Sequence, residues 1–197
     1  TRAILNDLKE KGVHVRELTL HVGAGTFRPV KAETIGDHDM HTEHLVISRE
    51  LVEQLKEKTG DIVAVGTTSV RTLESLYWMG VKRLAGQEDF FTLGQWEAYT
   101  LPQDYSLREA MEALCGWFDT ACHELLKART TIIIVPGYRY RVIDAMFTNF
   151  HQPQSTLLLL VGAAVGEDWH KIYDYALTHD FRFLSYGDSS LLEVKKS

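Results

Sequence analysis

The chain has 197 residues, of which 45% are hydrophobic and 24% charged, and its formal net charge is −6. This composition is typical of a folded protein with one sizeable core and argues against intrinsic disorder. The longest apolar stretch, residues 156–166, is shorter than the roughly 20 residues that cross a bilayer, and no charged leader or lipidation signal precedes it. We therefore expect a soluble, cytoplasmic protein without a membrane partner. The chain begins at Thr1 rather than at methionine, and we expect that an upstream segment has been removed.

The first half of the chain predicts helices and strands in alternation. We expect an amphipathic helix over 1–12, a strand over 13–22, a helix over 49–58 between a Ser48 cap and Gly60, a buried strand over 61–66, and a helix over 70–79 that ends at Gly80. The last two elements form a β-turn-α unit, a common building block of α/β sheets.

The second half continues this alternation after an irregular segment. We expect short strands at 88–93 and 96–101, a long helix over 106–128, strands over 130–135 and 138–150, helices over 155–165 and 168–179, and a last strand over 181–187. The pattern indicates a single layered α/β domain over residues 1–197 with a mostly parallel sheet. Cys115 and Cys122 lie seven residues apart in the long helix, too far apart for a disulfide, so we interpret both as core thiols.

The negative charge is concentrated in one segment. Residues 87–124 carry eight acidic residues and a single basic one, Arg108, whereas the rest of the chain is close to neutral. A polyanionic partner therefore remains compatible with the sequence, because phosphate contacts depend on local basic surface, and Arg139 and Arg141 precede a polar stretch. The alternative interpretation is that these two arginines are solvated strand positions.

Four polar stretches lie at the ends of predicted elements, where α/β proteins bind ligands. They are residues 21–30, 38–44, 66–74, and 144–156 together with 185–188. In the first, Gly23 and Gly25 allow close approach to a ligand and Arg28 suits an anion, although a structural turn explains the glycines equally well. In the third, hydroxyls at a helix start suit a carboxylate or phosphate, or simply cap the helix. Arg71 there either contacts a ligand or forms a surface ion pair with Glu74.

The fourth stretch, DAMFTNFHQPQST, combines acid, amide, hydroxyl and imidazole groups with two phenylalanines. A strand that only filled a core would not need so many donors and acceptors, because each buried polar group without a partner costs about 1–3 kcal/mol. Strand alternation places Phe147, Asn149 and His151 on one face and Thr148 and Phe150 on the other, unless the strand ends early. We expect His151, where the chain leaves the sheet, to titrate near neutral pH.

Five blocks resemble, in order, the motifs of one family. They are HVGAGTFRPV (21–30), MHTEH (40–44), VGTTSVRTLES (65–75), PGYRYRVIDAMFTNFHQPQSTLLLLV (136–161) and FRFLSYGDSSLL (181–192). The family is S-adenosylmethionine:tRNA ribosyltransferase-isomerase, an enzyme of queuosine biosynthesis. The resemblance covers the carboxyl-terminal part of such an enzyme and implies that the family's small β-rich domain is absent from this chain. The acidic segment at about 84–128 is longer than the usual link, and we expect it to face away from the tRNA anticodon.

The resemblance implies a transferase and isomerase that moves the ribosyl part of S-adenosylmethionine onto an aminomethyl-deazaguanine base at the tRNA wobble position. Epoxyqueuosine forms, and adenine and methionine are released. S-adenosylmethionine is then a consumed substrate, so no cofactor or metal is expected, and the partners of a monomeric enzyme are S-adenosylmethionine and tRNA. Such a reaction needs a base for a proton next to the sulfonium and polar contacts that hold the ribose hydroxyls.

The resemblance also implies site residues. The catalytic residues are expected to be His151 as acid or base, Asp144 facing the sulfonium or orienting a partner, and Asn149 holding hydroxyls or a base edge. Substrate-binding residues are expected to be Gly23, Gly25, Thr26, Phe27, Arg28, His41, Thr67, Thr68, Ser69, Arg71, Thr148, Tyr186 and Asp188. Phe147, Phe150 and Tyr186 could stack on adenine or deazaguanine.

Two other classes of function remain open. One is a metal-dependent hydrolase built on His38, His41 and His44, although their three-residue spacing suits neither face of a strand. The other is a non-catalytic RNA-binding fragment. Metal analysis of the purified protein separates the first from the transferase, and activity on intact tRNA separates the second.

Overall fold

The computed structural model describes residues 2–21 and 35–195 of the chain. Its α-helices are α1 (Arg2–Glu10), α2 (Arg49–Glu57), α3 (Thr67–Leu84), α4 (Leu107–Ala121), α5 (Thr156–Val165) and α6 (Asp168–Thr178). Its strands are β1 (Thr19–His21), β2 (Glu43–Ser48), β3 (Val63–Val65), β4 (Thr92–Leu93), β5 (Leu125–Thr130), β6 (Ala145–Asn149) and β7 (Ser189–Glu193). Three short 3-10 helices, η1 (Ile35–Asp37), η2 (Glu97–Tyr99) and η3 (Leu184–Tyr186), lie between them.

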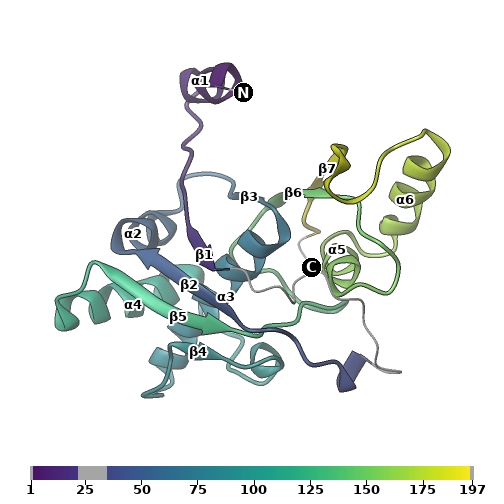
Figure 1. The fold of residues 1–197 in the computed structure, drawn as a ribbon. Coiled ribbons are helices and arrows are strands. Elements are labelled where there is room, and N and C mark those ends of the chain that lie inside the picture. The colour runs from purple at the N-terminus through teal and green to yellow at the C-terminus, as the bar shows by residue number, and fades with distance from the viewer. Residues whose placement is uncertain (1, 22–34, 196–197) are drawn as a thin grey trace.

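The described strands form two sheets of mixed direction (Figure 1). The first has the order β1-β2-β5-β4, in which β2 is antiparallel to both neighbours and β4 runs parallel to β5. The second has the order β3-β6-β7, in which β3 and β6 are parallel and β7 is antiparallel. The α/β class is therefore confirmed, but the mostly parallel sheet is wrong. The two strands that sequence reasoning missed, β2 and β7, each add antiparallel pairs.

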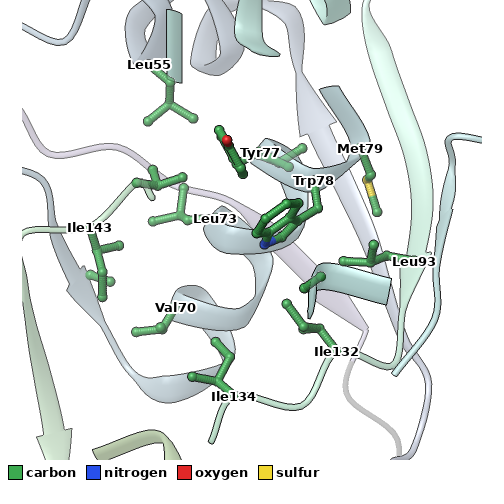
Figure 2. Close-up of a cluster of buried hydrophobic side chains, with 14 of the residues drawn as sticks. Leu55, Val70, Leu73, Tyr77, Trp78, Met79, Leu93, Ile132, Ile134 and Ile143 are labelled. Atoms are coloured by element: carbon green, nitrogen blue, oxygen red, sulfur yellow. The ribbon is translucent and has the colours of Figure 1, made fainter. Parts of the chain in front are cut away.

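The core lies between these sheets and the helices, with α3 at its centre (Figure 2). Alternate residues of β2 and β5, among them Ile47 and Leu126, are buried. Helix α2 packs against β2 and α3 against β4, and α4 packs against both helices. Helix α3 also packs against β3 and β6 of the second sheet. Val70, Leu73 and Trp78 of this helix are almost inaccessible to solvent, so one helix serves the hydrophobic core of both sheets.

Helix α3 continues past Gly80, which was predicted to end it. A Cβ atom at Gly80 would overlap the backbone of Ala110 in α4, so only glycine permits this close approach of the two helices. Gly80 is therefore required for the packing of α3 against α4 and does not end the helix. The predicted Ser48 cap, in contrast, is confirmed, because its hydroxyl accepts a hydrogen bond from Leu51 N, and Ser155 caps α5 in the same way at Leu158 N.

The predicted long helix over 106–128 contains two elements. Helix α4 ends at Ala121 because Cys122 adopts a left-handed conformation with φ of 53°, and β5 then begins at Leu125. The predicted strand over 130–135 is correspondingly shifted, since β5 ends at Thr130. Cys115 is buried as expected, but Cys122 is exposed and is not a core thiol.

Three other predicted strands are wrong in extent or type. The first, 13–22, shortens to β1, and residues 96–101 contain the 3-10 helix η2. The carboxylate of Glu97 holds this turn, because it accepts hydrogen bonds from Gly94 N and from the buried ammonium of Lys82. The last strand is β7 rather than 181–187.

The strand predicted over 138–150 shortens to β6 because a buried carboxylate competes for its backbone. Glu74 of α3 accepts hydrogen bonds from the N–H groups of Arg141, Val142 and Ile143, and from the hydroxyl of Tyr138. These donors are therefore not available to a sheet. Burial raises the pKa of Glu74, while the four hydrogen bonds oppose that rise.

In the described part of the chain, no helix is long and apolar enough to cross a membrane. Helix α1 contains no buried residue and stands apart from the remaining elements (Figure 1).

Candidate functional site

The parallel strands β3 and β6 end side by side, and helix α3 begins at the same edge. Val65 pairs with Phe147, and the N–H of Gly66 donates to the carbonyl oxygen of Phe147 at 2.8 Å. Gly66, with φ of 88°, makes the turn into α3 without a side-chain cap. The first N–H groups of a helix have no partner within the helix, so this edge presents donors suited to an anionic or carbonyl group. Thr67, Thr68 and Ser69 supply them.

Thr148 and His151 meet at this edge in a buried pair. The Oγ1 of Thr148 lies 2.8 Å from the Nε2 of His151, and the N–H of His151 donates to the hydroxyl of Tyr173 at 2.9 Å. Strand β6 ends at Asn149, so the alternation stops and His151 turns toward the side of Thr148. His151 is only 8% exposed, and burial lowers its pKa from 6.5 to about 4. The expected titration near neutral pH is therefore wrong, and His151 is a neutral hydrogen-bonding group at pH 7.

Asp144 lies at the opposite end of β6 from His151. Its Oδ2 accepts a hydrogen bond from Ile62 N at 2.9 Å and pairs with the ammonium of Lys58 at 2.8 Å. Because a strand rises about 3.3 Å per residue, the five residues of β6 hold the two side chains too far apart to line one ligand pocket. The structure therefore places Asp144 where it joins β3 to β6, away from the carboxyl edge.

Three further predicted residues lie at the end of β6 and in the loop before its neighbour β7. The side-chain amide of Asn149 donates to the backbone oxygen of Asp188 at 3.2 Å. The carboxylate of Asp188 accepts hydrogen bonds from the backbone N–H and the Nε of Arg182, which hold its pKa below the ordinary value. Tyr186 is 75% exposed in η3. Asn149 and Asp188 thus share the edge of His151, with an exposed aromatic ring on the same loop.

Arg71 is buried and pairs with Glu43 instead of Glu74, so the surface-pair alternative is wrong. Its Nη1 lies 2.8 Å from Glu43 Oε1, and its Nε donates to the carbonyl oxygen of Ile132 at 3.0 Å. Burial lowers the pKa of Arg71, and the nearby Glu43 carboxylate opposes this shift. Arg71 follows Thr67 by one helical turn, which places this pair directly beneath the start of α3.

Glu43 also contacts His41. The Nε2 of His41 lies 3.2 Å from Glu43 Oε1 and 3.5 Å from Arg71 Nη1. Within the described residues, the second carboxylate oxygen of Glu43 and the Nη2 of Arg71 are buried without a partner. Sequence reasoning missed Glu43, although it stands within the MHTEH block. The alternation of Glu43, Leu45 and Ile47 on the buried face of β2 is the signal that could have found it.

The three histidines proposed as metal ligands are not brought together. His44 follows Glu43 on β2 and is exposed on the opposite face, whereas His41 faces the Glu43 carboxylate. Over residues 2–21 and 35–195, no group of three His, Cys, Asp or Glu side chains is arranged to hold a metal ion. The ligand set of the hydrolase alternative is therefore contradicted.

Gly23, Gly25, Thr26, Phe27 and Arg28 lie outside the described residues. A groove of about 580 Å³ lies elsewhere, over β2, β5 and the segment around β4, and is lined in part by Phe91, Lys127 and Arg129. None of the predicted substrate-binding residues that the structure describes lines this groove, so its volume does not identify the site.

The two sheets and their helices define an α/β protein, and the carboxyl ends of the parallel strands β3 and β6 form its candidate ligand site. The family model for queuosine biosynthesis proteins matches residues 1–192, and the chain belongs to this family. It is 39% identical over 99% of its length to S-adenosylmethionine:tRNA ribosyltransferase-isomerase of Rickettsia bellii, and 38% identical to that of Rickettsia prowazekii. The chain spans 45% and 41% of the lengths of these curated relatives.

A solved structure agrees with this assignment. The crystal structure of S-adenosylmethionine tRNA ribosyltransferase from Thermotoga maritima matches 97% of this chain with a TM-score of 0.60 and 30% sequence identity. The match covers 49% of that protein. The family resemblance seen in the five sequence blocks is therefore confirmed.

Proposed function

We propose that this chain provides the α/β part of an S-adenosylmethionine:tRNA ribosyltransferase-isomerase. Its substrates are S-adenosylmethionine, consumed without a further cofactor, and a tRNA that carries aminomethyl-deazaguanine at the wobble position. Ribosyl transfer and isomerisation give epoxyqueuosine, adenine and methionine. The observation that carries this proposal is the 39% identity with a protein of that name across 99% of the chain.

The geometry of the carboxyl edge supports the same proposal. The start of α3 offers backbone donors beside hydroxyl side chains, and the end of β6 adds the Thr148–His151 pair. Such groups suit the ribose hydroxyls and the polar edge of a base, while the exposed ring of Tyr186 suits stacking. We assign His151 to substrate binding through a neutral hydrogen bond rather than to proton transfer, because its pKa of about 4 makes it a weak base.

The test is adenine release. The 197-residue chain is incubated with S-adenosylmethionine and tRNA carrying the modified base, and adenine is measured by chromatography. A tRNA with guanine at the wobble position is the matched control, and the full-length Thermotoga maritima relative shows that the assay works. Adenine that appears only with the modified tRNA supports the proposal. The assay is repeated with the part of the relative that this chain does not match added to it. No adenine in either assay, under conditions where the relative releases it, contradicts the proposal, and retention of tRNA without adenine favours the non-catalytic RNA-binding alternative.

A further inference from the structure

A second histidine of the chain, His41, lies partly exposed beside a buried carboxylate. The side chain of His41 is 21% exposed, whereas its partner Glu43 is 0% exposed. The imidazole therefore has its Nε2 against a buried carboxylate while part of the ring reaches the surface. Within the described residues, Nδ1 of His41 makes no hydrogen bond. His151, in contrast, is buried, and its Nε2 is hydrogen-bonded to the hydroxyl of Thr148.

The carboxylate determines which ring nitrogen carries the proton. An unprotonated Nε2 would place a lone pair 3.2 Å from the negatively charged Glu43 Oε1, which is repulsive. Arg71 Nη1 can only donate, so its contact with Nε2 would need the opposite tautomer, but at 3.5 Å it is longer than the 3.2 Å contact with the carboxylate. We therefore assign the proton to Nε2, which donates to Glu43, and the remaining nitrogen, Nδ1, is then an acceptor. Arg71 holds Glu43 in place through the 2.8 Å contact and balances its charge.

The cluster lies one helical turn from the start of α3. Arg71 lies one helical turn after Thr67, on the same face of α3, and His41 contacts Arg71 at the start of β2. Buried polar atoms without a partner are also characteristic of functional sites, and the second oxygen of Glu43 and Nη2 of Arg71 are such atoms among the described residues.

We propose that Glu43 is a positioning residue that presents Nδ1 of His41 as the base of the ribosyl-transfer site. This inference rests on the proposed function. The C–H bond next to the sulfonium of S-adenosylmethionine breaks, its proton forms an N–H bond at Nδ1, and its electron pair stays on carbon beside the positive sulfur. The imidazolium that results is stabilised by the Glu43 carboxylate.

The test separates positioning from folding with three substitutions. Glu43→Gln keeps the size of the side chain but removes its charge, and Glu43→Asp keeps the charge. Glu74→Gln is the matched control, because Glu74 is another fully buried carboxylate that only anchors a backbone segment. We expect Glu43→Gln to lower kcat for adenine release by about a hundredfold with KM for S-adenosylmethionine within about twofold, and Glu43→Asp to recover part of kcat. Glu74→Gln should lower the unfolding midpoint without a selective loss of kcat.

Loss of the Glu43 charge leaves Arg71 uncompensated, so Glu43→Gln could fail to fold. The double variant Glu43→Gln/Arg71→Gln removes both charges. It should fold, and its kcat should remain as low as that of Glu43→Gln. If it folds and kcat is retained, the inference is overturned.

A binding measurement keeps the inference separate from the proposed function. The imidazole NMR signals of His41, assigned by their loss in His41→Gln, should move when S-adenosylmethionine alone is added to the wild-type chain. If they do not move, the inference is overturned even where adenine is released. If they move and no adenine is released, the proposed function fails while the place of His41 beside the substrate stands.

Discussion

The buried imidazole of His151 should make the protein less stable in mild acid. Burial lowers the pKa of His151 from 6.5 to about 4 in the folded state, whereas an unfolded chain returns it to the ordinary value. Between these two values the unfolded state binds more protons than the folded state. The stabilisation is therefore fully present above pH 6.5 and is lost as the pH falls toward 4.

The size of the effect follows from the two pKa values. Over the whole window the shift corresponds to about 3 kcal/mol, at roughly 1.4 kcal/mol per unit. Between pH 7 and pH 5, about 2 kcal/mol of this should be lost, because His151 in the folded state is still mostly neutral at pH 5 while the unfolded histidine is charged.

The assay is urea unfolding of the wild-type chain and of His151→Gln at both pH values. Glutamine does not titrate and retains a polar group beside Thr148, so the variant should lose about 2 kcal/mol less than the wild type between pH 7 and pH 5. His170→Gln is the matched control, since the side chain of His170 is 59% exposed. An equal pH dependence in wild type and His151→Gln would refute the reasoning, because it would show that His151 is not held neutral by burial.

Three further substitutions test the packing described above. Gly80→Ala should destabilise the protein by about 3 kcal/mol in chemical unfolding because its methyl group meets the backbone of α4, while Gly116→Ala, in open space, should be neutral or stabilise by up to about 1 kcal/mol. Glu74→Gln should cost about 2–3 kcal/mol of unfolding free energy, because an amide cannot accept all the hydrogen bonds of the carboxylate; an unchanged midpoint would contradict this role. Asp144→Asn should lower stability by about 1–2 kcal/mol through its contact with Lys58 and leave S-adenosylmethionine affinity, measured by calorimetry, unchanged; a selective loss of affinity would restore Asp144 to the site.

Local signals predicted the helices well and the strands poorly. Ser48 is recognisable as a cap because capping depends on a hydroxyl close in sequence to the N–H group from which it accepts a hydrogen bond. Strand limits depend instead on partners distant in sequence. Nothing within residues 138–143 indicates that a carboxylate on α3 accepts hydrogen bonds from their N–H groups. The need for glycine at position 80 likewise becomes evident only from the position of α4 in the fold.

The candidate site was predicted in outline. Polar residues at the ends of β3 and β6 do share an edge, because parallel neighbours end together. The sequence did not indicate which of these polar side chains are buried. His151 has the residue type of a base and the surroundings of a neutral hydrogen-bonding group, while Glu43 remained unnoticed because β2 was not recognised.

Helix α3 has a consequence for the way in which the molecule opens. Its residues contact both sheets, and its Arg71, Glu74 and Lys82 bind the start of β2, the segment before β6 and the turn after β4. Neither sheet can separate from the other without breaking buried contacts of this one helix. We therefore expect the two sheets to unfold in a single cooperative transition, with the backbone amides of α3 exchanging their hydrogens only when the whole core opens. The candidate site at the start of α3 is thus attached to the helix that joins the two sheets, and we expect it to keep its geometry until the whole core opens.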